Sequence, residues 1–240
     1  DGTLTDPRSK MSLDFKTLFS KAVDRGMSVY IATGSDIDYV KEQCPDILDL
    51  DINYYCCNGA KQYKLLNGEV SLYKEKSITD VISEKSLEKI LLLIKNKQRI
   101  FEKEYKNITS NFIDKRGSMI NWCPIGRDSD DKFRKYFVAF DKKNNYRDRI
   151  VKYFKQMFIS DRSLKNMTIK KGGQTSFDIY PKGWDKSQIF KDIDRNKTIF
   201  WGDKCDQDGN DWEIYSLLHE SRRHFVSSPQ ETFDILEKML

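Results

Sequence analysis

The sequence lacks the features that mark membrane, secreted and metal-thiolate proteins. Its 240 residues contain no apolar run approaching the ~20 residues that a membrane-spanning helix needs. The five cysteines are odd in number and lack metal-ligand spacing, and the adjacent Cys56 and Cys57 cannot pair with each other without strain. The first residues form the polar string Asp1-Gly2-Thr3-Leu4-Thr5 rather than a signal-peptide pattern. We therefore expect a cytoplasmic protein with reduced cysteines.

Charge of both signs is abundant and evenly spread. The 42 Lys and Arg residues against 37 Asp and Glu residues give a net charge of +5, with no basic block. This balance does not require a nucleic-acid partner, and nothing in the chain indicates a membrane partner. A small basic surplus is also typical of proteins that bind phosphorylated metabolites, because guanidinium groups bind phosphate through paired hydrogen bonds.

The first third of the chain alternates helical and strand patterns, as an α/β sheet does. Ser12 can cap a helix that Gly26 ends, and the apolar run 27–32 predicts a buried parallel strand. A second helix is expected to about Cys44, and the pair Asn67-Gly68 is a strong hairpin signal. These elements predict that the first third of the chain forms part of an α/β domain.

A stretch of different character interrupts this α/β pattern at residues 77–183. It contains two lysine-rich helical segments and short alternating segments that predict strands, at 86–97, 147–158, 118–122 and 175–180. The α/β pattern then resumes, with a helix from Asp185, a strand over 197–201 and a terminal helix from Pro229. We therefore predict a discontinuous domain, 1–76 with 184–240, interrupted by an inserted α+β domain over 77–183.

Polar clusters follow the predicted strands at the points where an α/β sheet binds its ligands. They lie at residues 1–5, 33–36 and 202–211. They combine carboxylates, which suit a hard cation such as Mg²⁺, with hydroxyls, which suit phosphate oxygens. The sequence therefore predicts a phosphate and magnesium site at this edge of the sheet.

Four sequence blocks carry a resemblance to a known family. Asp1-Gly2-Thr3-Leu4-Thr5 resembles the end of the Asp-x-Asp-Gly-Thr signature of haloacid dehalogenase phosphotransferases. This block is similar to that of eukaryotic phosphomannomutases, as are the blocks at residues 121–127, 172–178 and 183–186, in the same order. The resemblance implies a Rossmann-like α/β haloacid dehalogenase core with an inserted α+β cap.

The same resemblance implies an enzyme of the isomerase class. Members of this family interconvert mannose 6-phosphate and alpha-D-mannose 1-phosphate through an aspartyl-phosphate and a hexose 1,6-bisphosphate, feeding GDP-mannose synthesis. They use Mg²⁺ and are homodimers through the cap. We expect these properties here.

The catalytic roles that the resemblance implies fall on residues of the core. The nucleophile would be an aspartate two positions before Asp1. Asp1 matches the general acid/base and also a magnesium ligand through its carbonyl, with Asp203 and Asp211 as further ligands. Lys186 matches the lysine that neutralises the transferred phosphoryl group. The hydroxyl of the second motif belongs to either Thr33 or Ser35, and the sequence leaves the choice open.

The substrate-binding roles fall mostly on the inserted domain. By resemblance, the phosphate that is not transferred would be held by arginines, because the planar guanidinium fork binds a dianion through two bonds at once. Ser176 and Asp178 match substrate contacts on a strand. The arginines expected to bind this phosphate are Arg8, Arg116, Arg127 and Arg134, and we expect Arg134 to be exposed and dispensable for folding.

Two other functions remain compatible with the residues. A sugar-phosphate phosphatase of the same fold would need the same metal motif, and a non-catalytic phosphosugar-binding protein would result if no nucleophile precedes Asp1. Glucose phosphates are possible secondary substrates. An additional cation site near 215–220 is uncertain, because Leu217 stands where an acidic residue is expected.

Overall fold

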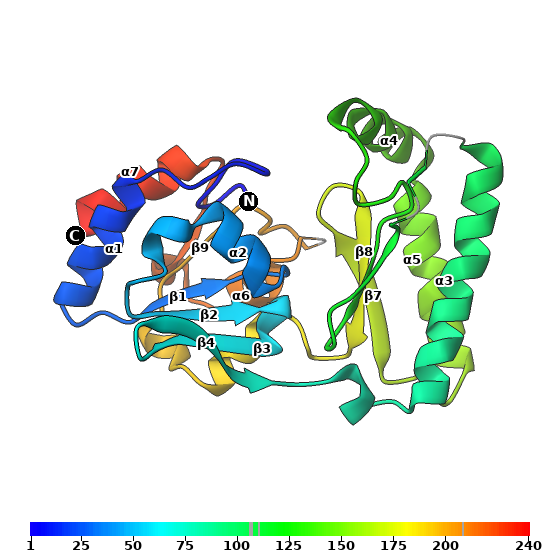
Figure 1. The fold of residues 1–240 in the computed structure, drawn as a ribbon, viewed down its shortest axis with the longest axis horizontal. Helices are drawn as coiled ribbons and strands as arrows, with labels where there is room; N and C mark the ends of the chain where they lie inside the picture. The colour runs from blue at the N-terminus through cyan, green and yellow to red at the C-terminus, as the bar shows by residue number, and fades with distance from the viewer. Residues whose placement is uncertain (106–107, 110, 208) are drawn as a thin grey trace. The chain divides into compact units, whose positions relative to one another are not determined.

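The computed structural model describes residues 1–105, 108–109, 111–207 and 209–240 (Figure 1). The chain divides into two compact units. Unit 1 comprises Asp1–Glu75 and Gly183–Leu240, and unit 2 comprises Lys76–Lys182. Each unit combines helices with a β-sheet.

Unit 1 contains a four-stranded sheet of order β1-β2-β3-β4 and a parallel pair, β9 with β10. β1 and β2 are parallel, and the following pairs are antiparallel. Asn67 and Gly68 join β3 to β4 with φ of 52° and 83°, the left-handed conformations that a two-residue hairpin turn requires. The strands are β1 Val29–Ala32, β2 Ile52–Cys56, β3 Lys61–Leu66, β4 Glu69–Glu75, β9 Phe200–Gly202 and β10 Arg223–Phe225.

β1 differs in burial from the sequence prediction. Its parallel pairing with β2 is as predicted, but Val29, Ile31 and Ala32 are only half-buried and Tyr30 is 37% exposed. The physical reason is the place of β1 at one end of the strand order, where a strand is paired on one side only. Apolar composition alone does not distinguish an end strand from a central one.

The helices of unit 1 begin and end near the predicted residues, with one exception. The residue before the first helix is Leu13, which makes no side-chain cap bond, so the prediction of Ser12 as the cap is wrong, although Ser12 accepts a hydrogen bond from the backbone of Asp14. Gly26 follows the helix with φ 75°. The helix predicted from Asp185 is instead a 3-10 helix, Lys186–Lys191, which begins with Asp185 accepting bonds from both the backbone and the hydroxyl of Ser187. The α-helices are α1 Asp14–Asp24, α2 Ile37–Gln43, α6 Trp212–Tyr215 and α7 Pro229–Met239.

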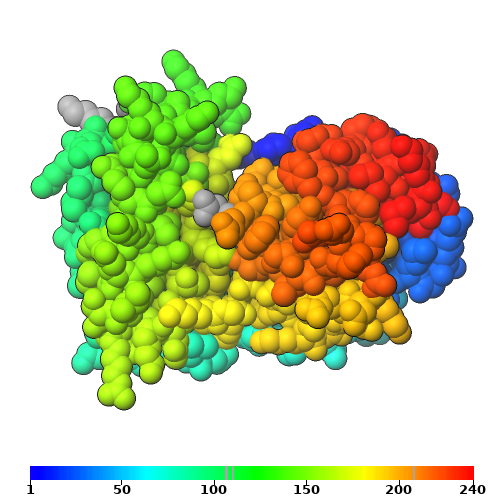
Figure 2. All heavy atoms as spheres, turned by 180° about the vertical axis from the view of Figure 1, so that it is seen from behind, coloured from blue at the N-terminus to red at the C-terminus, as the bar shows by residue number. Residues whose placement is uncertain are grey.

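Helix α7 packs on α1 and closes the core of unit 1 near the C-terminus. Phe15 of α1 meets Phe233 of α7 edge-to-face, with ring centroids 5.6 Å apart. Figure 2 shows α7, in red, at the surface beside the blue N-terminal segment. The terminal helix therefore covers the apolar face of α1 rather than projecting from the unit.

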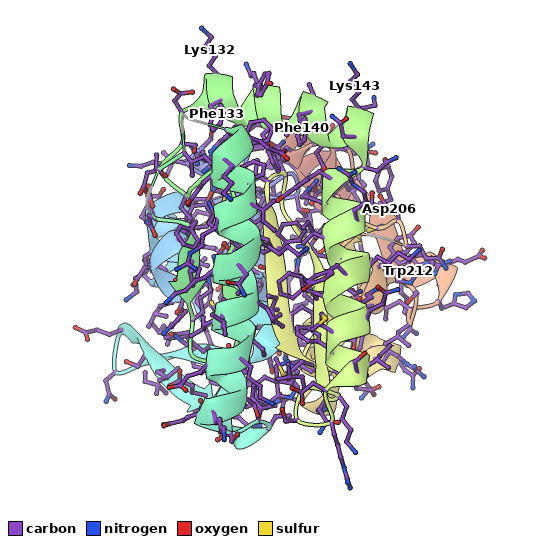
Figure 3. The ribbon with its side chains drawn as sticks, turned by 90° about the vertical axis from the view of Figure 1, so that its right-hand side faces the viewer. Lys132, Phe133, Phe140, Lys143, Asp206 and Trp212 are labelled. Atoms are coloured by element: carbon purple, nitrogen blue, oxygen red, sulfur yellow. The ribbon has the colours of Figure 1, made fainter. Side chains whose placement is uncertain are left out.

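Unit 2 is an antiparallel sheet of order β5-β6-β8-β7 with helices on one face. Figures 1 and 3 show α3 and α5 side by side against the strands, while Lys132 and Lys143 of α4 point outward. The sequence did not predict α4, β5 or β7, and α3 extends beyond its predicted end. The elements are α3 Glu84–Glu104, β5 Ile113–Lys115, β6 Ile120–Trp122, α4 Asp131–Asn144, α5 Tyr146–Ser160, β7 Met167–Gly172 and β8 Ser176–Pro181.

Alternation along the strands of unit 2 separates an apolar face from a polar one. Trp122, Phe177 and Ile179 lie in the core with Ile94 of α3 and Phe154 of α5. Their strand neighbours therefore point to the opposite face of the sheet, since successive side chains alternate.

No helix within the described ranges is long and apolar enough to cross a bilayer.

All five cysteines are buried, and none of them forms a disulfide. Burial raises the pKa of the Cys44 thiol to about 11 and that of Cys205 to about 12. Both thiols are therefore protonated at neutral pH and behave as small apolar groups, as predicted.

Gln98 provides a direct test of the packing in unit 2. It is 1% exposed, accepts a hydrogen bond from Trp122 Nε1 at 2.8 Å and donates one to the Pro124 carbonyl at 2.9 Å. Gln98→Leu would leave both groups buried without partners, so we expect the free energy of unfolding in urea to fall by about 2 kcal/mol or more. Gln156→Leu, on an exposed position of α5, is the control. Equal stability of the two variants would contradict this account.

Candidate active site

Gly2 and Asp203 bring the start of the chain against the end of β9. Gly2 has φ 81°, and a Cβ atom built on it would lie 2.3 Å from Asp203 Oδ2, so only glycine fits. Thr3 Oγ1 also donates to Asp203 Oδ1 at 3.4 Å. The structure thus brings together Asp1 and Asp203, two of the predicted site residues that are far apart in sequence.

Lys186 and Asp211 form a buried ion pair beside these residues. Lys186 Nζ lies 2.6 Å from Asp211 Oδ1, and the two side chains are 8% and 5% exposed. Burial opposes ionisation of Asp211, but the Lys186 ammonium and the backbone N–H of Lys204 keep its pKa below the ordinary value. The Asp1 backbone nitrogen lies within electrostatic range of Lys186, Asp203 and Asp211.

The carboxylate of Asp1 points to α2. Gln43 Nε2 donates to Asp1 Oδ1 at 2.6 Å, and Tyr39 OH lies 3.4 Å from both carboxylate oxygens. Thr5 Oγ1 adds a contact at 3.5 Å. Asp1 itself is exposed, whereas Gln43 is 7% exposed. A buried amide therefore fixes the orientation of a carboxylate that remains open to solvent, which suits proton transfer to a bound molecule.

Thr33 and Ser35, the two candidates of the second motif, have different surroundings. Thr33 Oγ1 accepts a hydrogen bond from the Ser35 backbone N–H at 3.1 Å. In contrast, the Ser35 hydroxyl has no hydrogen-bond partner within the residues that the structure describes. The backbone here is tied to the segment after β2, through Cys57 N to the Ser35 carbonyl and Asn58 N to the Thr33 carbonyl. Ser35 therefore has its full hydrogen-bonding capacity left for a ligand, whereas Thr33 retains its O–H donor.

Asp36 anchors the turn that carries these hydroxyls. It caps α2 by accepting from Ile37 N at 2.8 Å, and it binds Lys61 Nζ at 2.6 Å and Tyr63 OH at 3.1 Å. Burial alone would raise the pKa of Asp36, but the Lys61 ammonium, the Ile37 N–H and the Tyr63 hydroxyl outweigh it and lower the pKa. The carboxylate is thus charged and firmly held at neutral pH.

The oxygen atoms of this cluster suit a magnesium ion in type. Asp203 reaches the Gly2 backbone, and Mg²⁺ is commonly bound through one or two carboxylates together with waters and phosphate oxygens. Asp211, also predicted as a ligand, directs one oxygen to Lys186 and the other to the Lys204 N–H. Within the described ranges, no group of three or more His, Cys, Asp or Glu side chains could hold a metal. The donors therefore fit an ion that shares its shell with phosphate and water rather than one enclosed by the protein.

A polar row crosses the face of the unit 2 sheet that lies opposite to its apolar core. Asn121 of β6 is paired with Asp114 of β5 on one side and with Asp178 of β8 on the other. Asp178 is in turn paired with Lys170 of β7. Asn121 Nδ2 donates to Asp178 Oδ1 at 2.7 Å. Directly paired residues share a face, and this face is opposite to the apolar core. The row brings Asp178 into a network of polar side chains from adjacent strands.

Two predicted arginines share one carboxylate of this row. Arg116 Nε and Arg127 Nη1 lie 2.8 and 2.9 Å from Asp114 Oδ2. Arg127 Nη1 also donates to Asn121 Oδ1 at 3.1 Å, which links it to Asp178 through the amide. Arg116 is 10% exposed and Arg127 is 37% exposed. Arg127 is thus the more accessible of the two guanidinium groups.

Arg134 differs from its predicted state. Its guanidinium donates to the carbonyl of Ser129 at 3.0 Å, to Thr175 Oγ1 at 3.0 Å and to the Arg127 carbonyl. The side chain is half-buried and holds the segment that carries Arg127, so the expected exposure of Arg134 is wrong. Arg8 lies in unit 1, exposed and with φ 62°, and Ser176 begins β8 opposite Gly172.

Several residues of the site escaped sequence reasoning. Tyr39 and Gln43 lie four residues apart on α2, so they share a helix face, and that spacing was the available signal. Asp114 lies on a strand of three residues, too short for a periodic pattern. Lys204 lies 2.6 Å from Asp203 Oδ2, next to it in sequence, with no spacing signal.

Comparison with known proteins gives consistent matches over the whole chain. The family model described as eukaryotic phosphomannomutase matches residues 15–240. A phosphomannomutase of Glycine max is 32% identical over 237 residues, covering 97% of this chain and 90% of that protein. Those of Babesia bovis and Drosophila melanogaster are 30% and 32% identical over 241 and 246 residues, covering 100% of this chain and 95% and 92% of theirs.

Solved structures share the fold at lower sequence identity. A trehalose-6-phosphate phosphatase related protein matches with a TM-score of 0.55 at 17% identity, over 100% of this chain and 93% of the other. An N-terminally truncated, IMP-bound IMP-nucleotidase of Plasmodium falciparum matches with a TM-score of 0.66 at 14% identity, over 100% and 66%. These likenesses confirm the predicted α/β haloacid dehalogenase fold.

The pairing of Asp36 with Lys61 predicts a pH dependence of stability. Folding lowers the pKa of Asp36, so the charged carboxylate stabilises the fold fully above its ordinary pKa of 3.8. This stabilisation is lost as the pH falls through the pKa of the folded state. Asp36→Asn retains a capping oxygen but not the charge, so we expect its stability to fall less steeply below pH 4 than that of the wild type. Urea unfolding between pH 3 and pH 7 measures this.

Asp24→Asn, at the exposed end of α1, is the matched control for Asp36→Asn. It should follow the wild-type curve. Parallel curves for Asp36→Asn and the wild type would rule out a stabilising charge at Asp36.

Proposed function

Because the chain belongs to the eukaryotic phosphomannomutase family, we propose that it interconverts mannose 6-phosphate and alpha-D-mannose 1-phosphate. The observation that supports this most directly is the convergence of Asp1 and Gly2, Asp203 and the Lys186–Asp211 pair in unit 1. Such a cluster supplies a proton-transfer group, a carboxylate for a cation and a cation for phosphate at one place. Phosphoryl transfer depends mainly on this kind of positioning and charge neutralisation.

Asp1 serves as the general acid/base in the proposed reaction. It protonates the leaving sugar oxygen in one half-reaction and takes a proton from the attacking hydroxyl in the other. The nucleophile is an aspartate two residues before Asp1, which receives the phosphoryl group. Gln43, Tyr39 and Thr5 orient the Asp1 carboxylate through the contacts described above.

Lys186 neutralises the phosphoryl group. An ammonium group has three protons to donate, and Asp211 takes one of them. The other two are available for phosphoryl oxygens. Asp211 thus positions Lys186, and Asp203 with the Asp1 carbonyl would hold Mg²⁺. When bound, the ion neutralises charge on the phosphoryl oxygens.

The arginine network of unit 2 holds the phosphate that is not transferred. Arg127 is its most accessible guanidinium, with Arg116 beside it on Asp114, and Arg134 maintains the segment that carries Arg127. Ser176 and Asp178 contribute sugar contacts from β8. Arg8 is the corresponding arginine of unit 1. In this proposal unit 1 is the catalytic core and unit 2 the substrate-binding cap, and we propose a cytoplasmic homodimer that associates through the cap.

The reaction is tested with protein that includes the upstream aspartate, mannose 1-phosphate, Mg²⁺ and a catalytic amount of hexose 1,6-bisphosphate. We expect mannose 6-phosphate to form, measured by a coupled dehydrogenase assay. Asp1→Asn should lower turnover by about 100-fold or more, because general acid/base catalysis typically contributes 10²–10⁴-fold. Release of free phosphate without mannose 6-phosphate would favour the phosphatase alternative. An encoded sequence without aspartate two positions before Asp1 would end the enzymatic proposal.

Ser35 and Thr33 are distinguished by a pair of variants. If the Ser35 hydroxyl binds a phosphoryl oxygen, Ser35→Ala should lower kcat/KM by about 10- to 100-fold, the loss expected for a hydrogen bond to a charged group. Thr33→Val keeps the shape of the side chain and loses only the contact to the Ser35 N–H, so we expect a smaller loss. Steady-state kinetics with mannose 1-phosphate measures both. A larger loss in Thr33→Val would assign the phosphate contact to Thr33 instead.

A further inference from the structure

A basic pocket in unit 1 is lined by residues that the proposed reaction does not use. Its volume is about 490 Å³, within the range of small-molecule sites. The wall comes from two stretches of chain, the 3-10 helix Arg195–Lys197 and the segment from α6 to the 3-10 helix Glu220–Arg222. The lining residues are Arg195, Asn196, Leu217, Leu218, His219, Ser221 and Arg222.

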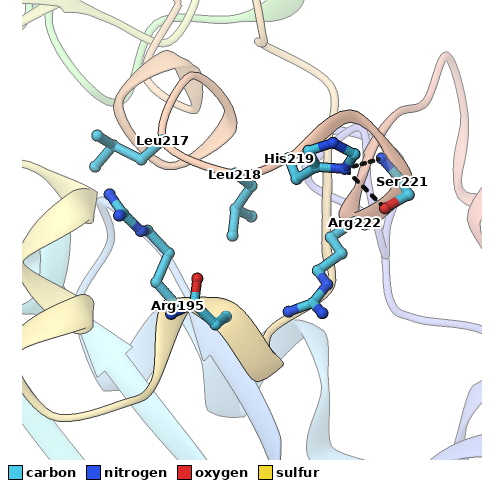
Figure 4. Close-up of a pocket in the computed structure, with 7 residues that line it drawn as sticks. Arg195, Leu217, Leu218, His219, Ser221 and Arg222 are labelled. Atoms are coloured by element: carbon cyan, nitrogen blue, oxygen red, sulfur yellow. Dashed lines mark hydrogen bonds between the residues drawn. The ribbon is translucent and has the colours of Figure 1, made fainter.

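The two arginines are available for a ligand. Figure 4 shows Arg195 and Arg222 on opposite sides of the pocket, with the Arg195 side chain extending toward Leu217. Across the part of the chain that the structure describes, neither guanidinium group forms an ion pair or a hydrogen bond. The neighbouring carboxylate of Asp194 accepts instead from the Asn196 backbone at 2.9 Å. Asp194 therefore does not pair with either guanidinium group of the pocket.

His219 adds a directed hydrogen-bond donor. Its Nδ1 accepts from the backbone N–H of Ser221 at 3.3 Å and lies 2.9 Å from Ser221 Oγ (Figure 4). A backbone N–H can only donate, so Nδ1 is the acceptor and the neutral ring carries its proton on Nε2. The ring thus offers an N–H donor while Ser221 holds its orientation.

The other part of the lining is apolar. Leu218 is 5% exposed and packs with Ile189 and Ile214 in a core cluster, whereas Leu217 is 44% exposed. An inorganic anion would contact the arginines but would leave the leucine surface in water. A ligand with an anionic group and an apolar body would cover both.

We propose that this pocket is a binding site for a phosphate monoester with an apolar body, separate from the catalytic cluster. A phosphate monoester carries −1.5 to −2 charge near neutral pH, which matches the two guanidinium groups. Each planar fork can form two bonds to phosphate oxygens. The apolar body lies on Leu217 and Leu218.

The proposal is tested by titrating the full chain with phenyl phosphate, glycerol phosphate and inorganic phosphate at constant ionic strength set with chloride. The readout is the NMR signal of the Leu217 and Leu218 methyl groups, which reports this pocket rather than the catalytic cluster. We expect saturable shifts with all three probes and the lowest Kd for phenyl phosphate. Equal affinity for phenyl phosphate and inorganic phosphate would overturn the assignment of an apolar ligand body. Absence of saturation would overturn the site.

The double variant Arg195→Ala/Arg222→Ala tests whether the two guanidinium groups bind the phosphate. We expect Kd for phenyl phosphate to rise at least tenfold, with an unchanged Tm because neither guanidinium has a partner among the described residues. Arg25→Ala removes an exposed arginine of unit 1 that does not line the pocket and should leave Kd unchanged. An unchanged Kd in the double variant, or an equal rise in Arg25→Ala, would refute the pocket as the site.

Discussion

The buried contact between Lys186 and Asp211 organises the candidate active site. It joins the 3-10 helix Lys186–Lys191 to the loop after β9, and Asp211 also accepts from the backbone of Lys204, next to Asp203. A buried ion pair adds little net stability, because the cost of removing both charges from water offsets their attraction. Two packed apolar residues could join these elements equally well. In the proposed reaction the retained charges have a chemical role: Lys186 neutralises the phosphoryl group, and Asp211 keeps Lys186 in place.

Local signals in the sequence predicted the parts of the fold that depend on local conformation. Asn67 and Gly68 adopt the left-handed conformations that favour these two residue types, and Gly26 follows α1 in the same conformation. The missed elements had weak patterns. α4 carries lysines among its aromatics and buries Phe137 alone, so its apolar face is narrow. β5 and β10 have three residues each, too few to show alternation. The burial of β1 depends on its neighbours in the sheet, which a single segment does not encode.

The site was predictable where residues follow strands or match family blocks, and unpredictable where side chains meet through tertiary structure. The family prediction is confirmed by the match over residues 15–240. The approach of Gly2 to Asp203 follows from the rule that strand ends gather at one edge of a sheet. In contrast, the contact of Gln43 with Asp1 depends on how α2 packs, and the bonds of Arg134 to backbone carbonyls depend on a loop path. Sequence blocks identified these arginines, but not which of them supports the others.

The arginine network also bears on how a mutase could handle its intermediate. The bisphosphate must turn round between two half-reactions, so its distal phosphate has to be held firmly and then released. Two adjacent guanidinium groups repel each other, and Asp114 between Arg116 and Arg127 offsets this repulsion before any substrate arrives. An arriving phosphate must then compete with Asp114 for the same donors. The phosphate therefore binds more weakly than it would bind to two arginines that lack a countercharge. In exchange, the guanidinium groups need little rearrangement when the phosphate binds. In the proposed reaction, the shared carboxylate thereby combines a preorganised site with an affinity low enough for release.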